Sequence, residues 1–349
     1  MRRILFLLCV VLSACTRSHH VNDEYLASLP EAECRLAPVD SLDLESLGVV
    51  SPANMIKYGR WLVFKESQTK YNLAIVNMDS HRKMDAVPVG RGPGEMLFGD
   101  NLYLEGTKAT LTDAYMLTMI ALDLSELRED HIPGLDTIGT FKSVRNAFSR
   151  LRSVEGGYVS PVPFHHTFDE DAWYSLWDVD GYCSAPISRP PVEGIEKTER
   201  TASHSFYCSS VMMVHPDKDR LCMGLVRMAA LSFAKIENRN LKEVKRVEYN
   251  RPKLYEYGGR TFIHAKRAFS GITSDQDRVF LLYSGRERND EIPEYEGNHI
   301  IAYDWNGNYI TRYYLSRNAV DIFMDGDELY CLSTYPSCKL FVYHLPKIS

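Results

Sequence analysis

Short apolar segments alternate with turn residues along almost the whole chain, and this pattern predicts strands rather than helices. The repeat near the C-terminus shows it most clearly. Apolar residues fill 279–283 and 300–303, Asn306-Gly307 is a typical hairpin turn, and a further predicted strand follows at 309–313. The sequence therefore predicts an all-β protein.

Groups of three or four such segments recur along the chain. Equivalent strands return at spacings of roughly 40 to 65 residues, the range in which propeller blades repeat. These strands contain Leu62, Tyr103, Tyr158, Leu221, Val279 and Leu329. Six repeats predict a six-bladed β-propeller of mostly four-stranded antiparallel blades. A pair of β-sandwiches is the alternative, but the repeats resemble one another along the whole chain, which favours the propeller.

The ends of the propeller are expected to meet. An unpaired strand edge promotes association with other chains, so a closed ring is favoured. We expect a strand near residues 39–50 to close the ring by pairing with the last blade.

The first residues resemble an export signal. Two arginines precede the apolar run Ile4 to Leu12, which is too short to span a bilayer. Leu12-Ser13-Ala14-Cys15 then resembles the lipobox of bacterial lipoproteins, which implies cleavage before Cys15 and acylation of its sulfur. An ordinary secretory signal with an incidental cysteine is the alternative. We expect a signal peptide over 1–14, a lipidated N-terminus and tether over 15–33, and the propeller over 34–349.

The residues after Cys15 indicate to which membrane and which side the exported lipoprotein would be sorted. Thr16, rather than Asp, follows the cysteine, which favours the outer membrane, and no acidic cluster comes next, which favours its periplasmic side over the cell surface.

The formal net charge of −6 and the lack of a Lys/Arg block argue against nucleic-acid binding. The 21 tyrosines suit both strands and recognition by aromatic contact.

The most distinctive motif is Gly90-Arg91-Gly92-Pro93-Gly94-Glu95. Alternating glycines with an embedded proline predict a tight turn in which the glycines allow positive φ, and Arg91 is expected to pair with Glu95. A phosphate-binding loop would need a helix directly behind it and usually a Lys followed by Ser or Thr, and neither follows here. We therefore interpret the motif as a structural turn.

This turn also carries a family resemblance. It resembles the G-x-G-P-G-E signature of the TolB-like, NHL-related six-bladed propeller lipoproteins. The segment Tyr303 to Tyr309 is similar to their recurrent strand-Asp-x-x-Gly-strand element. The resemblance covers most of residues 50–345 and is weakest in blades two to four, where 186–201 form a long irregular insertion. It implies fold and export more than a particular chemistry.

Two groups of polar residues are candidates for a binding or metal site. The first group ends comparable strands and is expected to line one rim: Glu66, Asp113, Ser284 and Ser333. Some six-bladed propellers hold calcium in the tunnel through such positions, but four different residues favour a recognition surface over a metal site. The second group is His165, His166 and Asp169. Adjacent strand residues point to opposite faces and no H-x-x-x-H spacing is present, so a polar loop is preferred over a zinc site.

The cysteines offer one candidate bridge. Cys331 and Cys338 flank a short turn that contains Pro336, and they could face each other across a hairpin. Export would permit the disulfide. The remaining cysteines of the exported part are interpreted as small buried hydrophobic residues.

These patterns predict an exported, lipid-anchored propeller that acts as a non-catalytic binding or scaffolding module of the bacterial envelope. We expect a monomer without a required cofactor, and an envelope protein, peptidoglycan or glycan as its partner. The alternative is a Ca- or Zn-dependent hydrolase or lyase of lactonase type, which the His/acid cluster and the rim carboxylates favour. A purely structural part of an envelope complex is the third hypothesis.

Overall fold

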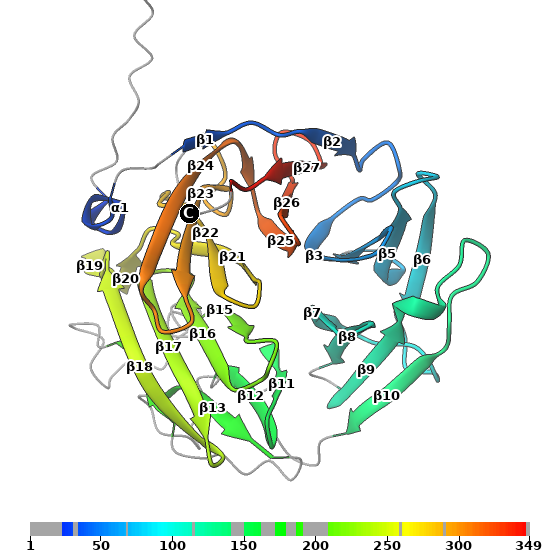
Figure 1. Ribbon diagram of the computed structural model, residues 1–349, viewed down its shortest axis with the longest axis horizontal. Coiled ribbons are helices and arrows are strands. Elements are labelled where there is room, and N and C mark those ends of the chain that lie inside the picture. Colours follow the sequence, from blue (N-terminus) through cyan, green and yellow to red (C-terminus); the bar gives the residue numbers. More distant parts are fainter. Residues whose placement is uncertain are drawn as a thin grey trace, which may run out of the picture.

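Six antiparallel sheets stand around one central axis and form a six-bladed β-propeller (Figure 1). The computed structural model describes residues 23–30, 34–67, 69–113, 116–140, 150–161, 172–178, 186–190, 209–257, 260–288 and 291–346. The predicted fold class is therefore confirmed, including mostly four-stranded antiparallel blades.

Each blade starts with an inner strand at the axis and ends at the outer edge of the ring. Blade one contains β3 (Pro52–Tyr58), β4 (Trp61–Glu66), β5 (Tyr71–Asn77) and β6 (Lys83–Pro88). Blade two contains β7 (Gly99–Glu105), β8 (Lys108–Asp113), β9 (Thr118–Asp123) and β10 (Leu135–Thr140), with the short helix η1 (Leu124–Glu126). Blade three contains β11 (Arg152–Val154), β12 (Gly157–Pro161), β13 (Ala172–Trp177) and β14 (Ile187–Ser188).

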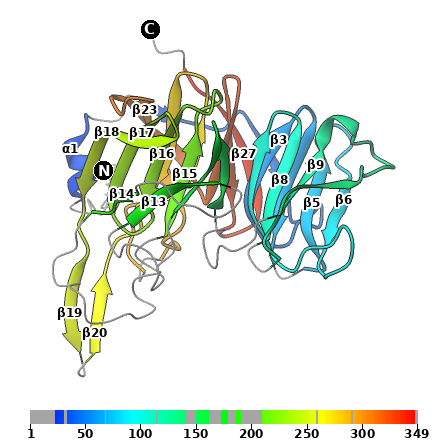
Figure 2. The same ribbon diagram turned by 90° about the horizontal axis from the view of Figure 1, so that it is seen from below.

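The second half of the chain continues this order. Blade four contains β15 (Ser210–Val214), β16 (Arg220–Leu225), β17 (Ala229–Glu237) and β18 (Asn240–Tyr249). Blade five contains β21 (Phe269–Ser274), β22 (Arg278–Tyr283), β23 (Gly297–Asp304) and β24 (Tyr309–Ala319). Blade six contains β25 (Asp321–Asp325), β26 (Glu328–Ser333) and β27 (Lys339–His344). Between blades four and five, the hairpin β19 (Lys253–Tyr257) and β20 (Arg260–His264) projects away from the ring (Figure 2).

The N-terminal segment closes the ring, as expected. Strand β2 (Asp40–Asp43) pairs antiparallel with β27 and supplies the outer strand of blade six, with Asp40 opposite Val342. Just before it, β1 (Cys34–Leu36) pairs in parallel with β24 of blade five. The second pairing was not predicted. Because of both pairings, the N-terminal segment joins the last two blades.

The core lies between neighbouring blades, because alternate residues of a strand point to opposite faces of its sheet. In blade six, Cys331 packs in a cluster with residues of blade five, whereas Cys338 packs in a cluster with residues of blade one. Both are free thiols. The predicted disulfide between them is therefore wrong: the two side chains lie on opposite faces of the blade, which a hairpin cannot bring together.

The end of the predicted tether packs on the propeller. Helix α1 (Glu24–Ser28) is capped by Asp23, and its Tyr25 is fully buried with its hydroxyl 2.8 Å from that of Tyr303. The Asp23 carboxylate accepts hydrogen bonds from Asn250 and Tyr283, which belong to blades four and five. Cys15 lies outside the described residues, so the predicted domain boundaries stay predictions. None of the described helices is long and apolar enough to cross a bilayer.

Candidate functional site

The six inner strands surround a central cavity of about 570 Å³. Residues from β3, β7, β11, β15, β21 and β25 all line it, and we call it the tunnel. Its volume lies within the range of small-molecule sites in proteins, roughly 300 to 1,000 Å³. Each blade consists of antiparallel strands in sequence order, so the inner strands all begin at the same end of the tunnel.

The tunnel has two polar ends that we name by their residues. The arginine mouth, where the inner strands begin, is formed by Asn54, Asp100, Arg150, Arg152 and Asp321. The histidine mouth, where they end, is formed by Glu105, His215, Lys218 and Ser274. Between the two mouths the lining is largely apolar and includes Ile56, Leu104, Met213, Ile272 and Phe323.

Two arginines dominate the arginine mouth. Arg150 and Arg152 flank the buried Leu151, and both are only partly exposed because they face the tunnel deep inside the propeller. Burial lowers the pKa of both guanidinium groups, that of Arg152 to about 10, so both are charged at neutral pH. The Arg152 guanidinium lies over the ring of Tyr103, 4.1 Å from its centroid.

The acidic groups of this mouth are already engaged by other partners. Asp321 is 7% exposed, and its Oδ2 accepts a hydrogen bond of 2.9 Å from the backbone N–H of Met55. Burial raises the pKa of Asp321 to about 7, against the lowering effect of this hydrogen bond and of Arg150. Asp100 pairs with Lys65 at 3.2 Å. Positive charge therefore exceeds negative charge at the arginine mouth.

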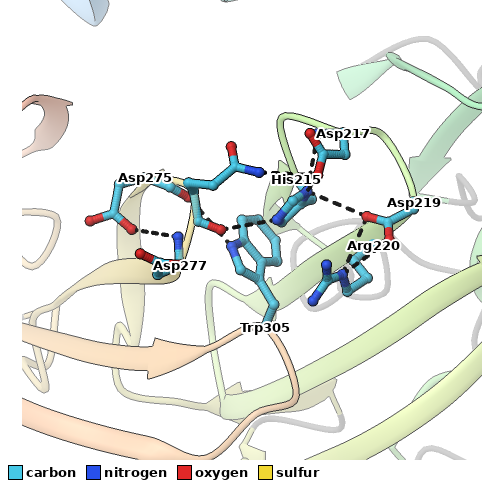
Figure 3. A network of polar contacts seen from close by, with 8 residues as sticks. His215, Asp217, Asp219, Arg220, Asp275, Asp277 and Trp305 are labelled. Atoms are coloured by element: carbon cyan, nitrogen blue, oxygen red, sulfur yellow. Dashed lines mark hydrogen bonds and ion pairs between the residues drawn. The ribbon is translucent and has the colours of Figure 1, made fainter.

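The histidine mouth is held together by a network around His215 (Figure 3). The Asp217 backbone N–H donates to Nδ1 of His215 at 3.0 Å, so Nε2 carries the proton and donates to the Gln276 carbonyl at 3.0 Å. The His215 ring also packs edge-on against Trp305, with the centroids 4.9 Å apart. The imidazole is 2% exposed. It therefore ties the β15–β16 turn of blade four to blade five.

A second link at this mouth joins blades two, three and four. Lys218 donates to Glu105, which also accepts a 2.7 Å hydrogen bond from Ser153. Burial alone would raise the pKa of Glu105, but the hydrogen bonds from Lys218 and Ser153 outweigh it, and the pKa is lowered overall. Glu105 is therefore ionised at neutral pH and holds Lys218 beside the tunnel.

The four predicted rim residues do occupy equivalent places, at or just after the ends of β4, β8, β22 and β26. All four are buried: Glu66, Asp113, Ser284 and Ser333. Glu66 accepts a hydrogen bond of 2.8 Å from Val50 N–H just before β3, and Asp113 accepts one of 2.8 Å from Leu97 N–H just before β7. Glu66 and Asp113 thus hold the chain that enters their own blade, whereas Ser284 and Ser333 donate to the carbonyl groups of Glu294 and Tyr335 in the loops that follow. The structure places none of the four in the lining of the tunnel.

The Gly90–Glu95 turn links blade one to blade two. Glu95 folds back so that its carboxylate accepts a 2.7 Å hydrogen bond from Gly92 N–H. A Cβ on Gly90 would lie 1.9 Å from this carboxylate, and Gly94 has φ of +77°. Positive φ therefore explains why position 94 is a glycine. At position 90 a glycine is needed because the Glu95 side chain approaches the backbone closely. Among the described residues no ion pair involves Arg91, so the expected pair with Glu95 is not formed.

The predicted metal candidates His165, His166 and Asp169 lie outside the described residues. Within the described ranges, no group of three or more His, Cys, Asp or Glu side chains is placed to share a metal ion. Sequence reasoning did not identify the arginine mouth. Its signal is weak, since Arg150-Leu151-Arg152 is an ordinary alternation of polar and apolar residues at the start of a strand.

A family model described as TolB-like 6-blade propeller-like matches residues 35–327 and confirms the predicted resemblance. The comparison with curated proteins gives no match. A solved member of the DUF4221 family from Bacteroides vulgatus is 11% identical, with 90% of this chain and 98% of that chain covered and a TM-score of 0.49. A structure titled "Putative exported protein" from Bacteroides fragilis is 9% identical over 90% and 99% of the two chains, with a TM-score of 0.46. A streptogramin B lyase is 12% identical over 88% and 87%, with a TM-score of 0.44.

Proposed function

Since this chain belongs to the TolB-like six-bladed propeller family, we propose that it works as a non-catalytic binding module whose ligand lies in the central tunnel. The observation that carries this proposal is the cavity of about 570 Å³, which residues from all six blades line. A largely apolar lining with a few polar groups is the usual composition of a ligand site.

The chemistry of the lining favours binding over catalysis. A general base must reach a proton of the substrate with a free ring nitrogen or carboxylate oxygen. Among the described residues of the lining, His215 uses both ring nitrogens in hydrogen bonds within the protein. Asp100 is paired with Lys65, and Oδ2 of Asp321 accepts the backbone N–H of Met55. Each of these groups is thus bound to another part of the protein, which supports a structural role.

We further propose that the module is anchored through a lipid on Cys15 at the outer membrane, facing the periplasm, where its partner is an envelope protein, peptidoglycan or glycan. The lipobox-like Leu12 to Cys15 supports this address. Replacing Cys15 with Ala should release the protein from the membrane fraction, and Cys9→Ala in the signal segment is the matched control. If the Cys15→Ala protein stays with the membrane, the anchoring proposal fails.

The binding proposal is tested by filling the tunnel. Ser270 lines it from β21, and Trp at this position would occupy part of the cavity. The exposed Ser80 provides the control variant Ser80→Trp. The immobilised full chain would be exposed to peptidoglycan fragments, glycans and solubilised envelope proteins, and bound material identified by mass spectrometry.

We expect a ligand that the wild type and Ser80→Trp retain and Ser270→Trp loses. Equal retention by both variants would contradict a site in the tunnel. A bound compound recovered with broken covalent bonds would contradict the non-catalytic role and favour the hydrolase or lyase hypothesis. Circular dichroism and melting of both variants establish that they are folded.

A further inference from the structure

The arginine mouth holds two arginines whose charge is offset only in part by its two carboxylates, Asp100 and Asp321. Neither Arg150 nor Arg152 forms an ion pair with a described residue, and Nη1 of Arg152 is buried without a hydrogen-bond partner there. A buried donor without an acceptor is costly, and natural structures rarely keep one. Two arginines that line the mouth thus have no carboxylate partner within ion-pair distance among the described residues.

A third arginine adds to this charge. Arg267, just before β21, lies close enough to Arg150 for the two charges to repel, and burial lowers its pKa to about 10. Its Nε is likewise buried without a partner among the described residues. By contrast, the neighbouring Arg227 forms two hydrogen bonds with Glu294, of which the one from Nη1 measures 2.6 Å. Within the described ranges, Arg150, Arg152 and Arg267 thus lack the direct ion pair with which Arg227 joins blades four and five.

The arginine that faces the tunnel is also fixed in place. Arg152 stacks on Tyr103, which is itself 8% exposed, so its guanidinium plane is held before any ligand arrives. A planar guanidinium presents parallel N–H donors that match the two oxygens of a carboxylate or phosphate. Pre-organisation of this kind lowers the entropy lost on binding.

Beyond the arginines the wall becomes apolar. Ile272 and Phe323 follow Ser270 and Asp321 by two residues along β21 and β25, so they line the next layer of the tunnel. Ile56 and Met213 complete this layer from β3 and β15. A ligand whose charged group reaches the arginines would therefore place its other end against apolar side chains.

We propose that the arginine mouth binds the carboxylate or phosphate group of an amphiphilic ligand, whose apolar part lies against Ile56, Met213, Ile272 and Phe323. This inference rests on the proposed binding function of the tunnel and names the chemistry of its ligand.

The first test compares head groups on one apolar chain. Hexanoate, hexyl phosphate, hexanol and hexylammonium would be titrated into the full lipidated chain in a neutral detergent by calorimetry, with the heats of detergent alone subtracted. We expect one or both anions to bind at least tenfold more tightly than hexanol or hexylammonium. Acetate and inorganic phosphate should bind more weakly than their hexyl counterparts, and the better anion identifies the head group.

The second test removes the charge. Arg152→Gln should weaken binding of the preferred hexyl anion by about ten- to a hundredfold, the usual effect of losing a charged hydrogen bond. Arg152→Lys should keep part of the affinity, because it keeps the charge but not the planar fork. Arg82→Gln is the matched control, since the Arg82 side chain is 67% exposed and away from the tunnel.

Equal affinity for hexanol and the anions, or unchanged binding by Arg152→Gln, would overturn the inference. If Arg152→Gln does not fold, the binding of the hexyl anion by Arg150→Gln and the wild-type comparison of head groups test the inference instead.

The two proposals can fail separately. If the hexyl anions do not bind but Ser270→Trp still abolishes retention of an envelope ligand, only the ligand class is wrong. If Ser270→Trp has no effect, the binding role of the tunnel fails first.

Discussion

At the scale of single residues, the propeller places ionisable groups where they must be stabilised by neighbours. Asp321 begins an inner strand, is 7% exposed and lies within reach of the charge on Arg150. Burial favours the neutral form of a carboxyl group more strongly than this arginine favours the charged form, which raises the pKa to about 7. Folding and proton binding are therefore linked at this residue.

We predict that Asp321→Asn changes how stability depends on pH. The pKa of Asp321 is about 7 in the folded protein, compared with an ordinary value of 3.8. Between these pH values the folded state binds more protons than the unfolded state, so the free energy of unfolding falls as pH rises and levels off above pH 7. Asn cannot titrate, and the variant should lack this decrease, which is a few kcal/mol at most.

Urea denaturation at pH 5 and pH 8 measures this difference. The matched control is Asp325→Asn in the same strand, because the Asp325 side chain is 48% exposed. If wild type and Asp321→Asn lose the same stability between the two pH values, Asp321 is ionised throughout this range. The difference between variant and wild type removes the contribution of other titrating groups.

The rim carboxylates give a second prediction at this scale. Asp113 is fully buried and accepts hydrogen bonds from the backbone N–H groups of Leu97 and Met116, at 2.8 and 2.9 Å. Asp113→Ala leaves these donors unpaired and should lower the free energy of unfolding by about 1–3 kcal/mol. Asp136→Ala is the control and should change it by less than about 0.5 kcal/mol, because the Asp136 side chain is 69% exposed. Similar stability of the two variants in urea denaturation would argue against the loop-holding role.

At the scale of elements, the strands inside each blade could be predicted from the sequence because both of their faces are buried. β4 and β22 illustrate this, since Trp61–Phe64 and Val279–Tyr283 are continuous apolar runs and are buried. The inner strand β3 was missed because Asn54, Lys57 and its first residue, Pro52, interrupt the apolar pattern. Inner strands border the tunnel, so polar residues are tolerated there. Helix α1 was missed because five residues carry too little periodicity to identify a helix.

The docking of α1 leads to a third prediction. Tyr25 is fully buried, and its ring packs against Phe269 and Tyr283 at centroid distances of 5.7 and 5.0 Å. Tyr25→Ala should release the helix from the propeller. The loss of global stability cannot exceed the free energy of docking, because the rest of the ring can stay folded after the helix detaches.

Limited proteolysis provides the measurement. Cleavage between residues 23 and 34 should be much faster in Tyr25→Ala than in the wild type. Tyr25→Phe keeps the ring and removes only the hydroxyl that contacts Tyr303, so its cleavage should be intermediate. Protection equal to that of the wild type in Tyr25→Ala would mean that Asp23 and its partners suffice to hold the segment.

At the scale of the whole molecule, the tunnel explains why the candidate site escaped the sequence. Its residues come from six strands, so Asn54, Arg152 and Asp321 meet only because the ring closes. No spacing of residues along the sequence therefore indicates that these side chains lie close together. The ring could be predicted because its repeats are visible along the sequence. Its closure was expected because an unpaired strand edge is unfavourable, although the pairing joins residues as distant as Asp40 and Val342. The chemistry of the tunnel depends on which repeats face each other across the axis.

Closure itself gives the last prediction. β2 holds the two ends of the chain together through its pairing with β27, and Leu42 packs partly buried against the cluster shared by blades six and one. Leu42→Asp would place a charge in this apolar contact and should lower the free energy of unfolding by about 1–3 kcal/mol. Ser41→Asp is the matched control, because Ser41 is exposed on the other face of the same strand. Urea denaturation measures stability, and hydrogen exchange in β26 and β27 should accelerate only in Leu42→Asp. Equal effects of the two substitutions would mean that the ring is held by its other blade contacts, and that β2 covers an edge without closing the propeller.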